Sequence, residues 1–320
     1  QTCARPIWLV AAPASRVASD GRPAYLPETG DTALGVTRPE IYVGDGMPGN
    51  YVVLKSNRAA GEIGPAGPGE QYTGTGGVTA GSFVRRLAMA LKFGEYNLFG
   101  SGLIQSDSRI LWVRDVRDRV QKVAPFLALD ADPYPVAADG RIYWVLDAYT
   151  TTSHYPYSED ADTSQLPGGS GLRRNFNYVR NSVKAVVDAY DGTVMLYRID
   201  ETDPIAAAWS RVFPGLLKPK GSLPAVLKDH LRYPEDLLRV QTAHLGKYHL
   251  TQADDFFNSD LRWCVSQDVP SEQSADVVSS AGVLLPAAPT AASASSSSTK
   301  CNTSGRYVPY YGLFTPPGAK

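Results

Sequence analysis

The sequence has few cysteines, no long apolar run and no excess of basic residues. Its cysteines, Cys3, Cys264 and Cys301, include no CxxC pair, so a zinc site of the usual spacing is not expected. No stretch approaches the roughly 20 apolar residues that a membrane-spanning helix needs. The N-terminus lacks the basic-then-apolar order of a signal peptide, which is compatible with a processed or truncated start. A net charge of -1 argues against nucleic-acid binding. We therefore expect no membrane span and no nucleic-acid partner.

Two segments carry the strongest structural signal. Residues 134–147 and 182–199 each contain an apolar strand pattern, an Asp-Gly pair and a second strand pattern. Asp-Gly between alternating apolar residues is typical of a β-hairpin turn. The similarity of the two segments predicts a pseudo-repeat whose four strands form one antiparallel sheet. We expect an α+β fold, with antiparallel hairpins covered by helices and large loops between them.

Helices are expected on either side of these hairpins. Ser82 precedes an apolar stripe of Phe83, Val84, Leu87, Ala88 and Leu91, and Gly94 follows it, so a capped helix is predicted there. A second helix is predicted over residues 108–124, and Pro125 ends it. Pro234 is expected to begin another. Residues 41–44 and 51–54 predict a further hairpin.

The composition changes near the C-terminus and divides the chain into three parts. Residues 1–270 are predicted to form the folded domain. Residues 271–305 are rich in serine and alanine and are predicted to be a linker, because such a composition cannot build a core. Residues 306–320 include several tyrosines and are predicted to dock back onto the domain. A Cys264–Cys301 disulfide would hold this region, and unpaired thiols are the open alternative.

Acidic residues near the first hairpin form a candidate metal site. Ca²⁺ and Mg²⁺ prefer several carboxylate and carbonyl oxygens, and the candidates are Asp130, Asp132, Asp139 and Asp147. Their spacing matches no known calcium loop, and Asp139 also fits a simple turn role. A glycine-rich segment before the first helix is a candidate anion site, formed by Gly74, Gly76, Gly77, Arg85 and Arg86. A tight turn that leads into the helix is the alternative.

The long polar loop over residues 150–171 is a candidate binding surface. Loops of this length are usually functional or mobile. Tyr149, His154, Tyr155 and Tyr157 concentrate aromatic side chains at its start, and tyrosine is favoured at interfaces. A loop packed against its own sheet would explain the same composition. No nucleophile motif accompanies His154, so no catalytic residue is assigned.

Several blocks occur together and in order over roughly residues 40–265. They include YTGTGGV (72–78), APFLALDADPYPV (124–136), DGRIYWVLDAYTTTSHYPYS (139–158), NYVRNSVKAVVDAYDGTVMLY (177–197) and HLRYPEDLL (230–238). In these blocks the chain resembles uncharacterised protein family 0182, large bacterial membrane proteins that are mainly actinobacterial and cyanobacterial. Its members typically carry a bundle of membrane helices followed by a large extracytoplasmic region. The membrane bundle is absent from this sequence.

The resemblance implies a location on the extracytoplasmic face of the cell membrane, in the bacterial envelope. It supplies no accepted catalytic residues. The favoured function is a non-enzymatic scaffold or interaction subunit whose partners are other membrane or envelope proteins, with no required cofactor. A metal-dependent hydrolase that acts on cell-envelope polymers, using Ca²⁺ or Mg²⁺, is the alternative. A surface structural protein with a spacer tail is a third.

Overall fold

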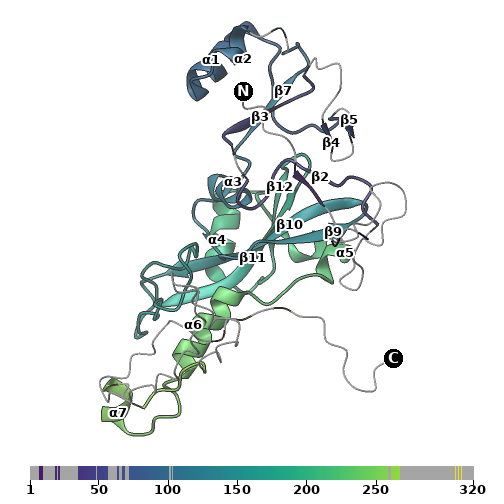
Figure 1. Ribbon diagram of the computed structural model, residues 1–320. Helices are drawn as coiled ribbons and strands as arrows, with labels where there is room; N and C mark the ends of the chain where they lie inside the picture. Colours follow the sequence, from purple (N-terminus) through teal and green to yellow (C-terminus); the bar gives the residue numbers. More distant parts are fainter. Residues whose placement is uncertain are drawn as a thin grey trace, which may run out of the picture.

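The computed structural model describes residues 7–9, 19, 21, 35–47, 49–56, 63–64, 67–68, 72–100, 102, 104–258, 261–266, 307, 309 and 311. A six-stranded sheet forms the centre of the molecule, in the order β13-β12-β11-β10-β8, with β9 also paired to β10 (Figure 1). Its strands are β8 (Ala128–Leu129), β9 (Tyr134–Ala138), β10 (Arg141–Thr152), β11 (Tyr178–Asp188), β12 (Val194–Arg198) and β13 (Leu217–Pro219). The α+β prediction is confirmed, and the strands of both predicted hairpins lie in this one sheet.

The first hairpin has the predicted turn. Arg141 pairs with Ala138, and the antiparallel register continues to Val145 and Tyr134. Asp139 and Gly140 form the two-residue connection, with φ of 49° and 75°. Positive φ at both positions is what a type I′ turn requires, and aspartate and glycine tolerate it best.

The second hairpin is longer than the sequence indicated. Strand β11 pairs antiparallel with β12 from Val183 opposite Arg198 to Val187 opposite Val194. Residues 189–193 connect them, because Asp188 closes the turn by donating its amide to the carbonyl of Thr193. The Asp-Gly pair is therefore part of a wider loop here, and the two hairpins share strand pairing but not turn geometry.

Alternation along β10 and β11 produces two cores, one on each face of the sheet. Leu146, Ala148, Val183, Ala185 and Val187 pack on one face with α3 (Val116–Val123) and with Trp209 of α4 (Pro204–Val212). Val145 and Val186 point to the other face, toward α5 (Ala225–Lys228). Side chains of a strand alternate between faces, so a sheet covered on both sides has nearly continuous apolar strands.

A smaller sheet lies beyond one end of the central sheet (Figure 1). It joins β3 (Tyr51–Leu54), β7 (Arg109–Trp112) and β6 (Val78–Thr79), and it carries α1 (Phe83–Phe93) and α2 (Asn97–Gly100). Two predictions are wrong here. Residues 109–112 form a strand rather than the first half of a helix, because Ile110 and Leu111 are both buried and Asp115 caps α3 only afterwards. Strand β3 pairs with β7 and not with residues 41–44.

The predicted first helix is confirmed, but its orientation is not the expected one. Gly94 ends α1 in the left-handed conformation, with φ of 67°. The side chain of Ser82 makes no capping hydrogen bond, and no residue of α1 is fully buried. The apolar stripe that begins at Phe83 faces away from the core.

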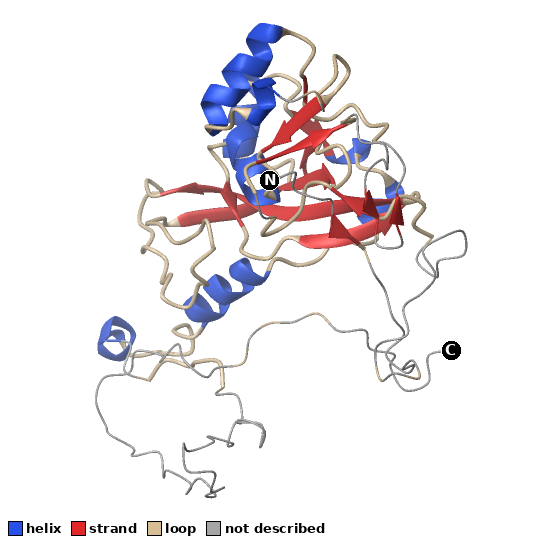
Figure 2. Ribbon diagram, turned by 45° about the horizontal axis from the view of Figure 1, so that its top comes forward, coloured by secondary structure: helices blue, strands red, loops and turns tan. Residues whose placement is uncertain are grey.

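The remaining elements complete the periphery. Helix α6 (Glu235–Leu245) lies below the central sheet and leads toward α7 (Ala253–Asn258) (Figure 2). The others are β1 (Ile7–Trp8), β2 (Glu40–Ile41), β4 (Ile63–Gly64), β5 (Gly67–Pro68) and the 3₁₀ turn η1 (Lys220–Ser222). Within the described ranges, no helix has the length and apolar character needed to cross a bilayer.

The tail is described at three positions only. The predicted linker, residues 271–305, lies outside the described residues. Tyr307 donates its amide to the carbonyl of Ser266, and Tyr311 donates its hydroxyl to the carbonyl of Tyr233. Cys264 is disulfide-bonded. Cys3 and Cys301 are outside the described residues, so the predicted Cys264–Cys301 pairing is too.

Candidate functional site

A turn at residues 155–158 is held by one side chain from the next strand. Asn177 donates its amide group to the carbonyl oxygens of Tyr155 and Ser158, at 2.9 and 3.3 Å. Its side-chain oxygen accepts the amide of Tyr155 at 3.0 Å. Ser158 Oγ returns a bond of 3.1 Å to the backbone carbonyl of Asn177. Four hydrogen bonds therefore fix this turn to the residue just before β11.

The turn directs Tyr157 into solvent. Its side chain is fully exposed and its φ is 56°. A bulky residue with positive φ is a true outlier, since the Cβ atom crowds the following carbonyl. Tyr155 is half exposed and stacks on Tyr178, with ring centroids 5.6 Å apart. His154 is exposed and lies beside Thr152.

Tyr149, which the sequence grouped with these aromatics, does not share their surface. It is completely buried and donates its hydroxyl to Asp130. It belongs to the core cluster beneath the long loop. The exposed aromatic surface therefore consists of Tyr155 and Tyr157, with His154 next to them.

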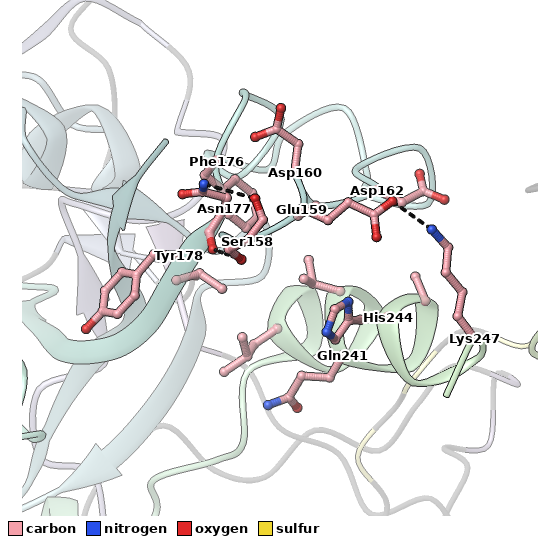
Figure 3. Close-up of a pocket in the computed structure, with 15 residues that line it drawn as sticks. Ser158, Glu159, Asp160, Asp162, Phe176, Asn177, Tyr178, Gln241, His244 and Lys247 are labelled. Atoms are coloured by element: carbon pink, nitrogen blue, oxygen red, sulfur yellow. Dashed lines mark hydrogen bonds and ion pairs between the residues drawn. The ribbon is translucent and has the colours of Figure 1, made fainter. Parts of the chain in front are cut away.

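A pocket of about 300 Å³ opens beside this turn, between the long loop and α6 (Figure 3). Phe176, Val179, Leu237 and Val240 provide its apolar lining, and Ser158 and Tyr178 connect it to the turn. Apolar pockets with a few polar groups at the edge are the usual form of binding sites in proteins.

The rim of the pocket is charged. Glu159 accepts an ion pair from Lys247 at 2.8 Å, and Arg262 pairs with Asp162 at 3.2 Å. Asp160 makes no ion pair with any described residue. His244, also in the lining, lies 2.8 Å from the hydroxyl of Tyr248. The rim therefore has one more acidic group than its paired cations neutralise.

The predicted metal residues are divided by the structure. Asp130 directly follows β8, and its amide donates to the carbonyl of Asp147 at 2.9 Å. Its carboxylate accepts from the Asp132 amide at 3.0 Å, from the Asp236 amide at 3.2 Å and from the Tyr149 hydroxyl. This is a buried carboxylate network that uses backbone and phenol donors.

Asp147 has a different partner, and Asp139 lies elsewhere. The Asp147 carboxylate is ion-paired with Lys184 and accepts from the side chain of Asn181 at 2.9 Å. Lys184 also donates to the carbonyl of Arg232 at 2.9 Å. Asp139 occupies the hairpin turn, six strand residues or roughly 20 Å away. Across the part of the chain that the structure describes, no three His, Cys, Asp or Glu residues are grouped to hold a metal ion.

Burial dominates the electrostatics of this network. It raises the pKa of Asp147 above its ordinary value, in spite of the opposing attraction of Lys184. Burial also raises the pKa of Asp236, and partial desolvation raises that of Asp132 although its side chain reaches solvent; the neighbouring charge of Asp130 adds to both shifts. Burial and then Asp132 raise the pKa of Glu235. Clusters of perturbed acids are common at functional sites, although structural networks produce them too.

The glycines of the predicted anion loop make room for close packing. A Cβ atom on Gly76 would lie 2.1 Å from the backbone oxygen of Asp191, and one on Gly74 would lie 2.4 Å from the hydroxyl of Tyr72. Gly77 has a φ of 75°. These positions require glycine for steric and backbone reasons alone.

The arginines near this loop are bound to the protein. Arg109 donates to three carbonyl oxygens of the loop, at 2.5, 2.6 and 2.9 Å. Arg85 donates to Thr79 Oγ1 and Arg86 to the carbonyl of Ala80, both at 2.7 Å. The loop thus turns its carbonyl groups toward the Arg109 guanidinium, and it leads into β6 and then α1.

Sequence reasoning missed Asn177, the pocket residues on α6 and Lys184. Lys184 had a visible signal, because a lysine within the apolar strand VKAVVD is expected to be buried with a counter-ion. Asn177 and His244 had none, since their roles depend on segments distant in sequence.

The chain matches known proteins over most of its length. The model of an uncharacterised protein family, UPF0182, matches residues 8–319. A UPF0182 protein of Frankia alni is 45% identical over 280 residues, covering 81% of this chain and 27% of the relative. One from Rhodococcus jostii is 41% identical over 83% of this chain and 29% of its own length. One from Saccharopolyspora erythraea is 42% identical over 82% and 29%.

The chain spans less than a third of the length of these curated relatives. No solved structure matches it significantly.

Proposed function

We propose that this chain, which belongs to the uncharacterised protein family UPF0182, is a non-enzymatic interaction domain. In this proposal it binds another protein subunit at the extracytoplasmic face of the bacterial membrane. The resemblance described above supports this location. The disulfide of Cys264 also supports it, because disulfides persist in oxidising compartments and are rare in the cytosol.

The presentation of Tyr157 carries the proposal. An exposed tyrosine costs nothing at a flexible loop tip, but this one is held at positive φ by a turn that Asn177 fixes. Strained conformations persist only where surrounding contacts determine them, and they concentrate at functional positions. Tyrosine is enriched among residues that dominate binding energy, and a fixed turn reduces the entropy lost on binding.

The adjacent pocket supports a partner of particular chemistry. Its apolar lining can receive the aliphatic part of a long side chain. Its acidic rim, where Asp160 has no paired cation among the described residues, favours a positive end group. Lysine and arginine combine these features. The interface is therefore proposed to place a basic partner side chain in the pocket while Tyr157 packs beside it.

Gentle detergent extraction followed by affinity capture and native mass spectrometry tests this function. Tyr157→Gly removes the ring and suits the left-handed backbone, so this variant should fold normally. Its recovery of the co-purifying subunit should fall by at least about tenfold. Asn177→Asp preserves size but replaces both amide donors, and it should give an intermediate loss. Tyr96→Ala, at another exposed tyrosine far from the turn, is the matched control.

Two results would contradict the proposal. One is a wild-type chain that is recovered as a lone monomer from its native membranes. The other is a subunit that is recovered equally well with Tyr157→Gly and with Tyr96→Ala. In either case the exposed turn would have no part in assembly.

A second candidate function draws on the carboxylate network. A metal-dependent hydrolase acting on envelope polymers would need ionised carboxylates such as Asp132 as ligands, and a protonated acid as proton donor, a role that suits the raised pKa of Glu235. Asp132 is exposed, so Asp132→Ala should not unfold the protein. If the wild-type chain binds Ca²⁺ or Mg²⁺ in calorimetry and the variant does not, the enzyme hypothesis gains support. Equal metal binding by the wild type and the variant, or no binding by either, would exclude the enzyme hypothesis.

A further inference from the structure

Helix α1 packs on the protein through its less exposed side. Met89, Ala90 and Phe93 contact the small apolar cluster around Ile110 and Leu98. The ring of Phe93 lies 4.6 Å from that of Tyr51, measured between centroids. These contacts hold α1 against the three-stranded sheet, at the end of the molecule opposite α7 (Figure 1).

The opposite face of α1 presents large apolar side chains to solvent. Phe83 is 64% exposed, Val84 70%, Leu87 40% and Leu91 76%. The Phe83 ring also contacts the ring of Phe99 in α2, with centroids 4.9 Å apart, so it marks the α2 side of the stripe. At about 100° per residue these four side chains, with Ala88, form one continuous stripe. Single exposed apolar residues need no explanation, but a contiguous stripe marks an interaction surface.

Cations border this stripe. Arg85 and Lys92 are seven residues apart, which places them within about 20° of each other on the helix surface. Lys92 Nζ lies 5.0 Å from the ring centroid of Trp112, and Arg85 donates to Thr79. Residues 83–93 include no aspartate or glutamate. The exposed half of α1 is therefore apolar at its centre and positive at one edge.

We propose that this stripe is a lipid-binding surface, on which α1 lies parallel to a bilayer with anionic headgroups. Helices that bind in this way combine an apolar face that enters the headgroup boundary with lysine and arginine beside it. The basic edge is complementary to acidic phospholipids. An antiparallel two-fold dimer through the same face would instead bring the two cationic edges together, because both copies use the same patch.

Vesicle flotation with the full chain tests the proposal. The vesicles contain phosphatidylglycerol and phosphatidylcholine, or phosphatidylcholine alone. We expect binding to the anionic vesicles that falls with added salt. The double variant Val84→Gln, Leu91→Gln keeps helix-forming residues and should bind at least about tenfold less. Arg85→Gln with Lys92→Gln should remove most of the preference for anionic lipid.

A matched control changes equally exposed apolar residues elsewhere. Phe257 and Leu261 are 88% and 63% exposed near α7, and their replacement by glutamine should leave vesicle binding unchanged. Equal loss in both double variants, or wild-type binding no greater than that of the Val84→Gln, Leu91→Gln variant, would overturn the proposal. So would a dimer in sedimentation experiments that dissociates in that variant, because a second copy would then occupy the stripe.

This inference is independent of the proposed function. Subunit capture is measured in detergent and depends on Tyr157, whereas flotation uses purified protein and depends on α1. Either proposal can therefore be refuted while the other stands.

Discussion

Replacing Lys184 with methionine should strongly destabilise the folded chain. Both partners of the Lys184–Asp147 ion pair have only 4% of their side-chain surface exposed. Methionine matches the length of lysine but leaves the Asp147 carboxylate buried with only Asn181 as a side-chain donor. Removing one member of a buried pair typically costs about 3–5 kcal/mol, a large part of the roughly 5–15 kcal/mol by which proteins are stable.

The loss should depend on pH with a definite sign. Burial raises the pKa of Asp147 already in the wild type, and removal of Lys184 raises it further. Above the ordinary aspartate range, the unfolded chain is then ionised at this position while the folded variant retains the proton. The folded state binds more protons, so its stability falls as pH rises. The difference between Lys184→Met and wild type should therefore be smaller at pH 5 than at pH 8.

Urea unfolding followed by circular dichroism measures the effect, and calorimetry should show a decrease in Tm of roughly 6–20 °C. The double variant Lys184→Met, Asp147→Asn removes both charges and should recover at least about half of the lost free energy. A single variant that costs less than about 1 kcal/mol would refute the reasoning. So would a double variant whose loss equals the sum of the two single losses.

Two further predictions concern stability. Asp203→Ala should cost at least about 3 kcal/mol in urea unfolding, because buried Asp203 caps α4 and accepts hydroxyl groups of Thr150 and Ser182, both at 2.6 Å. Although burial opposes ionisation, the hydrogen bonds from Ser182 and Thr150 hold the pKa of Asp203 below its ordinary value. Its stabilisation should therefore be present at neutral pH and disappear as pH falls through that lowered pKa, and unchanged acid unfolding in Asp203→Ala would contradict this. Gly76→Ala should lower stability by about 2 kcal/mol or more through its clash with Asp191, whereas Gly221→Ala, which meets no atom within 4 Å, should have little effect in the same assay.

Part of the candidate site could be predicted from sequence. The long loop was identified by its length and its tyrosines, and the structure places Tyr155 and Tyr157 at its surface. The sequence could not distinguish Tyr149 from these exposed tyrosines, because its burial results from other segments covering β10. Asn177 and α6 could not be found, because they meet the loop only after the sheet has formed.

Local sequence determined the elements that depend on local chemistry. Asp139-Gly140 specified a tight turn because few other residues accept positive φ, and Pro125 and Gly94 set the ends of α3 and α1. The apolar residues on either side of each Asp-Gly pair made β10 and β11 recognisable as strands.

Tertiary structure decided everything that depends on which surfaces meet. The stripe on α1 has the periodicity of a buried helix face, yet the sheet beneath it binds the other side. Residues 109–112 form strand β7 and not a helix, because β3 and β6 pair with them on both sides. Asp130 and Asp147 are brought together by a backbone hydrogen bond. Asp139 is closer to Asp147 in sequence than Asp130 is, but the extended strand β10 separates the two in space. Sequence patterns encode the shape of one element, and the choice among its possible partners is made by the free energy of the whole packed chain.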